Sequence, residues 1–185
     1  MSSLTFDRRK MALASLAGAL APALAWGAET APENVQSVVV RECALAGAER
    51  KGVLVVFYSS WCAWCRVMDA LLADPASVSA IGSRFRILHM RVLETEPRYL
   101  RQQFAGADDF YHQNAGDIDG VPFLVFLDAQ GEALATTRTA SGDNIGFPGT
   151  AAEYAGFDAM LARAAPDMTA QERNDVLTAA RRLLK

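Results

Sequence analysis

Two cysteines three residues apart, placed between an apolar run and a helical pattern, constrain the fold of this chain more than any other feature. The apolar run VLVVFY (53–58) is continuous, β-branched and aromatic, which is typical of a strand covered on both faces. Cys62 and Cys65 follow in the motif WCAWC, and beyond them apolar residues recur at helical spacing through Leu72. By spacing alone, the pair fits a redox couple, half of a metal site or a structural disulfide.

The position of Cys62 favours a reactive thiolate. A cysteine at the point where a strand ends and a helix begins has its sulfur near unpaired backbone N–H groups, and these groups and the helix dipole lower the thiol pKa below its free value of about 8.5. Cys65, one turn further along, is close enough to attack a mixed disulfide formed at Cys62, and we expect it to be less exposed. We therefore predict that Cys62 attacks and Cys65 resolves.

The second informative stretch is DGVPF (119–123), where Pro122 leads into an apolar strand. Because proline has no N–H to donate to a sheet, it belongs at the start or edge of a strand. A cis bond between Val121 and Pro122 would suit a tight turn at this point. A lone Val-Pro pair means little, but this one follows a strand–CxxC–helix unit and directly precedes a hairpin.

The rest of the chain alternates helical and strand patterns, with a loop expected over 107–120. Both C-terminal helices open on a capping box, Thr150 with Glu153 and Thr169 with Glu172. Together the elements predict an α/β sandwich around a small mixed sheet. The predicted strands are 53–58, 84–92, 123–127 and 132–138; the predicted helices are 33–52, 65–81 with a break or bend at Pro75, 96–106, and the two C-terminal helices, which Pro166 separates.

At this point the residues resemble a known family. The stretches VLVVFYSSWCAWCRVMDALL and DIDGVPFLVFLDAQGEAL are similar to the thioredoxin superfamily, above all to secreted thioredoxin-like proteins with an aromatic residue before the second cysteine. The similarity extends over roughly 33–165. It implies a thioredoxin-like fold, a central mixed sheet flanked by helices, with 167–185 as an appended helix. It also implies thiol–disulfide oxidoreductase activity without a cofactor, with Cys62 and Cys65 as the redox pair.

The resemblance further implies which residues meet the substrate. Trp61 would pack beside the site, and Pro122 would be a cis-proline facing Cys62. The backbone of Val121 would pair with an extended substrate segment, as in strand addition. The substrates would be protein or small-molecule disulfides, and an upstream thiol donor would restore the reduced state. The implied substrate-contacting set is Trp61, Ala63, Trp64, Val121 and Pro122.

The chain departs from the family pattern in two ways. Thioredoxins carry a buried carboxylate six residues before the first cysteine, and this chain has Val56 there. Proton transfer at Cys65 would then fall to water or to another acid, with Asp117 and Asp119 as candidates. The Ala-Trp pair between the cysteines lacks the proline typical of thioredoxins and the histidine typical of strong periplasmic oxidants. The missing histidine removes one stabiliser of the thiolate, which favours a reductant or a general exchanger.

Other functions for the cysteines remain open from the sequence. A zinc site needs two more ligands at characteristic spacing, and the chain offers only Cys43, His89 and His112 besides the pair. We expect Cys43 to be a buried small hydrophobe, His89 to lie on a strand and His112 to be a solvated loop residue. We assign no metal. The alternative function is a non-catalytic module of the same fold that binds copper or a partner protein through these cysteines.

The N-terminus is typical of an export signal. A basic cluster, FDRRK (6–10), precedes the uncharged apolar stretch 11–25, which ends in ALA. We predict a signal peptide over 1–25, exported through either the general or the twin-arginine route, the latter because of Arg8-Arg9. A single domain would then occupy 26–185. The apolar stretch is shorter than the about 20 residues that a spanning helix needs, so we expect no membrane anchor after cleavage.

Charge excludes some partners. The whole chain carries 18 basic and 21 acidic residues, and loss of 1–25 would leave a net charge of about −5. An acidic protein of this kind is a poor ligand for nucleic acids and anionic membranes. In a bacterial host the exported protein would work in the periplasm, where disulfides persist.

Overall fold

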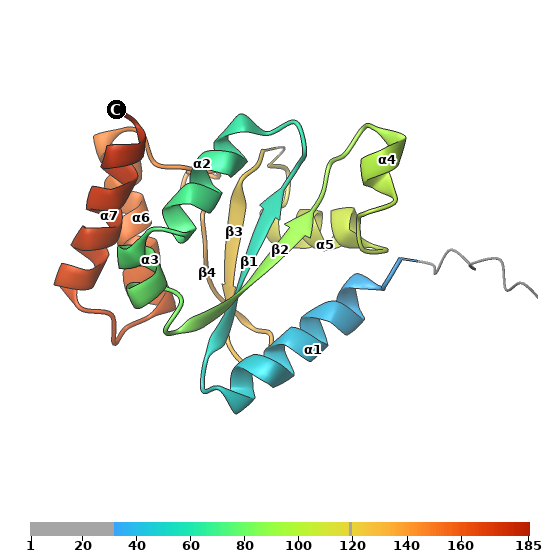
Figure 1. The fold of residues 1–185 in the computed structure, drawn as a ribbon, viewed down its shortest axis with the longest axis horizontal. Coiled ribbons are helices and arrows are strands. Elements are labelled where there is room, and N and C mark those ends of the chain that lie inside the picture. The colour runs from blue at the N-terminus through green and yellow to red at the C-terminus, as the bar shows by residue number, and fades with distance from the viewer. Residues whose placement is uncertain (1–31, 119) are drawn as a thin grey trace, which may run out of the picture. The chain divides into compact units, whose positions relative to one another are not determined.

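The computed structural model describes residues 32–118 and 120–185, and a mixed four-stranded sheet lies at its centre. The strands lie in the order β2-β1-β3-β4, with β2 parallel to β1, β3 antiparallel to β1, and β4 antiparallel to β3 (Figure 1). All four predicted strands are present, although the last is shorter than predicted. Their bounds are β1 Gly52–Tyr58, β2 Phe85–Arg91, β3 Phe123–Leu127 and β4 Ala133–Thr136.

Helices flank this sheet, as predicted for an α/β fold. The helix expected over 33–52 already ends at Ala48, and the helix expected over 96–106 is confined to a single turn. The helices of the described residues are α1 Val35–Ala48, α2 Ala63–Leu72, α3 Pro75–Ala80, α4 Pro97–Leu100, α5 Ala107–Ala115, α6 Ala151–Ala164 and α7 Ala170–Leu183.

Strand β1 is buried on both faces, as its apolar sequence predicted. Because successive side chains of a strand point to opposite faces, Leu54 and Val56 pack with α2, α3, α6 and α7, whereas Val53, Val55 and Phe57 pack with α1 and α5. All five side chains are fully buried, and burying each one contributes about 1.5–3 kcal/mol. A one-residue slip would move each set to the wrong face, so this burial fixes where the cysteine motif begins.

Pro75 separates two helices, which agrees with the predicted break. Asp74 caps α3 by accepting the N–H of Ala76 at 3.0 Å, and Pro75 occupies the first turn. Proline is favoured there because its missing N–H would have no partner in the helix. The chain therefore turns after α2, and α3 then leads it back towards β2.

The prediction of a loop over 107–120 was wrong for most of its length, because α5 occupies Ala107–Ala115. Ala107, Tyr111 and Ala115 recur every four residues and are buried against the sheet. Two of these three residues are alanines, so the apolar face is weak in the sequence. Two acidic residues in the first turn favour the helix through its dipole.

Both predicted capping boxes are formed, at the starts of α6 and α7. At the second, Glu172 accepts hydrogen bonds from the Thr169 N–H and hydroxyl and from the Arg84 guanidinium, and these lower the pKa of Glu172 to about 2. Helix α7 packs on α2, α3 and α6, burying Val176 and Ala180 (Figure 1). The C-terminal helix is therefore part of the core on that side of the sheet.

The predicted signal peptide, 1–25, lies outside the described residues. Over the part of the chain that is described, no helix combines the length and the apolar character needed to cross a membrane.

Candidate active site

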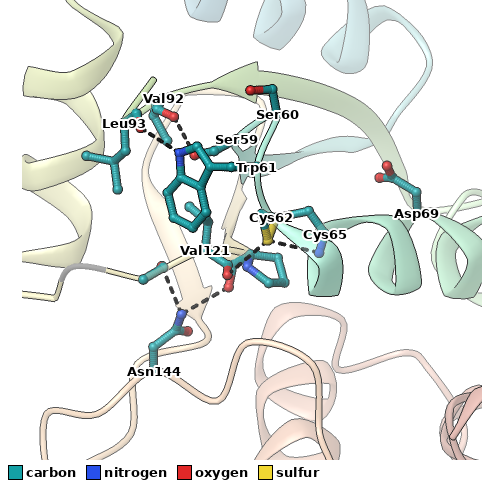
Figure 2. Close-up of a disulfide and its surroundings, with 12 residues drawn as sticks. Ser59, Ser60, Trp61, Cys62, Cys65, Asp69, Val92, Leu93, Val121 and Asn144 are labelled. Carbon is teal, nitrogen blue, oxygen red and sulfur yellow. Dashed lines mark hydrogen bonds between the residues drawn. A yellow bond between two sulfur atoms is a disulfide. The ribbon is translucent and has the colours of Figure 1, made fainter. Parts of the chain in front are cut away.

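Cys62 and Cys65 form a disulfide at the N-terminus of α2, with their Cα atoms 5.4 Å apart. Cys62 is the N-cap residue, and its Sγ atom accepts the Cys65 N–H at 3.0 Å (Figure 2). The sulfur therefore lies where the first backbone N–H groups of the helix point, and where the helix dipole favours negative charge. Once the disulfide is reduced, this position stabilises a thiolate at Cys62.

The two cysteines are almost equally buried, at 4% for Cys62 and 3% for Cys65. The sequence predicted a lower exposure for Cys65, and a difference of this size does not distinguish them. What distinguishes them is their place in the helix, because only Cys62 has its sulfur in the capping position.

The Val121–Pro122 pair lies directly opposite Cys62. The Val121 carbonyl oxygen is 3.3 Å from Cys62 Sγ, and the peptide bond between Val121 and Pro122 is cis (Figure 2). Within residues 32–118 and 120–185, the Val121 N–H has no hydrogen-bond partner. Val121, beside the disulfide, thus has a backbone N–H that makes no hydrogen bond among the described residues and a carbonyl oxygen that faces Cys62 Sγ.

The loop that carries the disulfide is held by the segment that follows β2. The Ser59 hydroxyl donates to the Val92 carbonyl at 2.5 Å, and the Trp61 indole N–H donates to the Leu93 carbonyl at 3.0 Å (Figure 2). Because β1 and β2 are parallel neighbours, their C-terminal ends lie at the same edge of the sheet. This edge is where the two loops meet and where the cysteine motif starts.

Glu94 strengthens the same contact, although no sequence pattern pointed to it. Its side chain is fully buried, and its two carboxylate oxygens accept the Ser60 N–H and hydroxyl, each at 2.6 Å. Arg91 donates to the same carboxylate at 3.0 Å. Burial raises the pKa of Glu94, but the hydrogen bonds from Ser60 and Arg91 outweigh it, so the pKa lies below its usual value. The carboxylate therefore stays ionised at neutral pH, and it contacts Ser60, which lies two residues before Cys62.

The proline loop is held by two neutral side chains. The Tyr111 hydroxyl, from α5, donates to the Ile118 carbonyl at 2.7 Å and accepts the Gly120 N–H at 3.0 Å. The Asn144 side-chain amide donates to the Gly120 and Pro122 carbonyls, at 3.0 Å each (Figure 2). No sequence pattern singled out either residue for the site.

The predicted aromatic residues border the disulfide. Trp61 and Trp64 are 56% and 54% exposed, and Ala63 between the motif's cysteines is also exposed. The Trp64 ring stacks on Phe147, with ring centroids 5.9 Å apart and planes 19° apart. The structure therefore gathers every predicted contact residue around one disulfide, and it adds Phe147 as a support for Trp64.

Of the two acids that the sequence offers for proton transfer, Asp117 and Asp119, only Asp117 lies within the described residues. Val56 is fully buried in β1, so no carboxylate occupies that position. Asp117 is exposed beyond the end of α5, and Asp119 lies outside the described residues. Among the described residues, Glu94 is a buried carboxylate that contacts the cysteine loop, through Ser60.

The other candidate ligands lie apart from the pair. His89 is on β2 as predicted and pairs with Asp69 at 3.0 Å, whereas His112 is on α5 and not in a loop. Cys43 is buried as predicted, and burial, with smaller contributions from Asp128 and Glu42, raises its pKa. In the described part of the chain, no group of three or more His, Cys, Asp or Glu side chains could hold a metal ion.

Three solved structures illustrate what this chain is similar to. A disulphide isomerase from Xylella fastidiosa Temecula1 is 19% identical, with a TM-score of 0.44, over 81% of this chain and 91% of that one. A DsbH oxidoreductase is 23% identical, with a TM-score of 0.45, over 74% of this chain and 88% of that one. Tryparedoxin from Trypanosoma brucei is 18% identical, with a TM-score of 0.36, over 49% and 72%. No curated protein matches the chain.

A family model described as thioredoxin-like matches residues 35–129, which are just over half of the chain. The match begins at α1 and ends after β3, so it includes the CxxC disulfide and the Val121–Pro122 pair. The sheet order and the position of the disulfide agree with that assignment. The chain belongs to the thioredoxin-like family and has a fold of the thiol–disulfide oxidoreductase type with a CxxC pair.

Proposed function

We propose that this protein is an exported thiol–disulfide oxidoreductase whose redox couple is Cys62 and Cys65. The observation that carries the proposal is the position of Cys62 Sγ, which accepts the Cys65 N–H at the start of α2 and lies 3.3 Å from the Val121 carbonyl. A thiolate is the attacking species in disulfide exchange, and a helix N-terminus stabilises it. Family membership supports the same chemistry.

The reaction proceeds through a mixed disulfide. The Cys62 thiolate attacks one sulfur of the substrate disulfide, the substrate S–S bond breaks, and the leaving sulfur takes up a proton as a thiol. Cys65 then gives up its proton and attacks Cys62 Sγ. The mixed disulfide breaks, the second substrate thiol leaves, and the Cys62–Cys65 disulfide remains. Two electrons pass to the substrate, and an upstream thiol donor returns them to the protein.

Substrate binding follows from the surroundings of the sulfur. An extended segment that pairs with the Val121 N–H and carbonyl would bring its own disulfide beside Cys62. The exposed rings of Trp61 and Trp64 would contact apolar side chains of that segment, with Ala63 and Pro122 completing the surface. A protein disulfide suits this surface, because only a polypeptide offers both the backbone and the side chains.

The direction of electron flow is proposed from the residues between the cysteines. Ala63 and Trp64 provide neither a histidine nor another charged group to stabilise the Cys62 thiolate further. A less stabilised thiolate makes the dithiol a better reductant, because the reduced form of a strong oxidant owes its stability to that thiolate. We therefore assign a reductase or exchange role.

Export and domain organisation complete the proposal. Residues 1–25 would act as a signal peptide, 26–185 would form one thioredoxin-like domain, and 167–185 would be its appended helix. The support for export is the basic cluster at 6–10, the apolar stretch at 11–25 and the small residues at its end. The periplasm would then be the site of action.

Dithiol-driven reduction of insulin tests the activity. The protein should accelerate insulin reduction, Cys62→Ser should abolish the acceleration, and Cys43→Ala should leave it intact, because Cys43 is buried on the other side of the sheet from α2. No acceleration by the unmodified protein would contradict the proposal. Stoichiometric copper in the reduced protein, lost when both motif cysteines become serine, would favour the binding-module alternative.

The reduction potential of the couple tests the direction. A reductase should lie near the thioredoxin value of about −270 mV, whereas a strong oxidant lies near about −120 mV. A potential near that of the strong oxidant would still be consistent with disulfide exchange, but electrons would then pass from the substrate to the protein.

A further inference from the structure

Asn144 lies in the connection between β4 and α6, and its side chain reaches the active site. Its Nδ2 atom is 3.0 Å from the Gly120 carbonyl oxygen and 3.0 Å from the Pro122 carbonyl oxygen (Figure 2). An amide NH2 group has two hydrogens, so it can donate one to each carbonyl. These two carbonyls belong to the residues on either side of Val121, whose own carbonyl faces Cys62 Sγ.

The orientation of the amide is fixed by a third hydrogen bond. The Asn144 Oδ1 atom accepts the Gly146 N–H at 2.9 Å, which requires the oxygen on that side and the NH2 group towards the proline loop. Gly146 has a φ of +56°, a conformation that glycine adopts without strain. The turn at 144–146 is therefore shaped to present the amide to the two carbonyls.

The segment that carries Asn144 is anchored to the sheet. The Ile145 N–H donates to the Thr137 carbonyl at 2.9 Å, and the fully buried Thr137 hydroxyl accepts the Leu124 N–H at 3.0 Å. Leu124 lies in β3, directly after the proline loop. Asn144 thus rests on a rigid support and is not a surface side chain that happens to contact a loop.

We propose that Asn144 is a positioning residue for polypeptide substrates. By holding the carbonyls on both sides of Val121, it presents the Val121 N–H and carbonyl to an incoming strand beside Cys62. This inference rests on the proposed function and adds to it, because it ties backbone recognition to one side chain outside the cysteine and proline motifs. Each backbone hydrogen bond to the substrate contributes about 0.5–1.5 kcal/mol, so a proline loop that presents Val121 poorly would weaken substrate binding.

The proposal separates two classes of substrate. A polypeptide disulfide depends on pairing with Val121, whereas a small disulfide such as bis(2-hydroxyethyl) disulfide has no backbone to pair and needs only the Cys62 sulfur. Loss of the Asn144 hydrogen bonds should therefore weaken binding of the first class and spare the second. A residue that supported only the fold would affect both classes equally.

The test compares Asn144→Asp and Asn144→Ala with the parent chain. The first variant keeps the shape but sets a carboxylate oxygen against two carbonyl oxygens, and the second removes the donors without adding charge. Asn114→Asp is the matched control, because the Asn114 amide also donates to a carbonyl, that of Phe110 at 2.8 Å within α5. The measurements are kcat and KM for insulin, the rate constant with bis(2-hydroxyethyl) disulfide, and the thermal melting curve.

We expect both Asn144 variants to raise the KM for insulin by about tenfold, the equivalent of about 1.4 kcal/mol, with kcat changed less than about twofold. The rate with the small disulfide should stay within about twofold of the parent, as should every value for Asn114→Asp. If Asn144→Asp does not fold, Asn144→Ala carries the test.

Two results would overturn the inference while leaving the proposed function in place. One is an unchanged KM for insulin in a folded Asn144 variant, and the other is an equal loss with both disulfides. A parent chain that fails to reduce insulin would instead overturn the proposed function, and this inference with it.

Discussion

The two loops that face each other across the disulfide are held in different ways. On the cysteine side, Ser60 is clamped by the buried Glu94 carboxylate, which is in turn paired with Arg91. On the proline side, the loop is held by the hydroxyl of Tyr111 and the amide of Asn144. A charged group anchors the loop that carries the cysteines, and neutral groups anchor the loop proposed to recognise the substrate. The two sides should therefore respond differently to mutation and to pH.

The largest effect is expected from breaking the charged anchor with Glu94→Ala. This change leaves Arg91 and two Ser60 donors without their buried partner, which should lower the free energy of unfolding by about 3 kcal/mol. Glu96→Ala is the control, because the Glu96 side chain is exposed and its ion pair among the described residues is with Arg98. Urea unfolding of both variants measures the difference. Equal stabilities would show that the Glu94 contacts contribute nothing.

A smaller loss is expected from breaking the neutral anchor with Tyr111→Phe. The change keeps the buried ring and removes the hydroxyl, which leaves the Gly120 N–H and the Ile118 carbonyl without that partner. An unsatisfied backbone group costs about 1–3 kcal/mol, so we expect a loss of about 2 kcal/mol in urea unfolding. A loss larger than that of Glu94→Ala would reverse the ranking of the two sides.

The contact between the two sides should contribute less. Trp64, from the cysteine motif, stacks on Phe147, which follows Asn144 in the same connection. Aromatic pairs contribute about 0.5–1.5 kcal/mol beyond burial, and Trp64 is half exposed, so Trp64→Ala should cost about 1 kcal/mol. Trp64→Phe, which keeps a ring, should recover most of the loss. If both variants lose the same stability, the stack is not the source.

The smallest effect expected is a pH dependence confined to the cysteine side. The pKa of Glu94 is lower in the folded protein than its usual value of about 4.3, so its stabilising contribution is complete above that pH and is lost as the pH falls through the folded-state pKa. The stability difference between the parent and Glu94→Gln should therefore shrink on acidification below about pH 4.3. The difference between the parent and Asn144→Ala should stay constant, because an amide does not titrate. A constant difference for Glu94→Gln would contradict this account.

The elements that the sequence predicted correctly are those whose patterns involve residues close together in the chain. Strand β1, the cysteine motif and the start of α2 form one continuous stretch whose patterns are local, and so they were predicted correctly. The capping boxes of α6 and α7 were predicted for the same reason, since each involves residues three apart. Helix α5 was missed because its buried face consists of Ala107, Tyr111 and Ala115, which barely stand out among polar neighbours.

The anchors of the two loops could not be predicted from local patterns. Glu94 lies 34 residues after Ser60, and Asn144 lies 22 residues after Pro122. Neither residue belongs to a motif, and both lie in segments with no periodic pattern. Their roles arise only in the folded sheet, where the C-terminal ends of β1 and β2 and the N-terminal end of β3 lie at one edge.

Cys62, held at the start of α2, is proposed to be the attacking thiol of a redox pair. Trapping of mixed disulfides tests this proposal most directly. Reduced Cys65→Ser and Cys62→Ser proteins are each mixed with a peptide disulfide, and the adducts are located by mass spectrometry. We predict a stable adduct on Cys62 in the first protein and none on Cys65 in the second. An adduct on Cys65 alone, or on neither cysteine, would contradict the account.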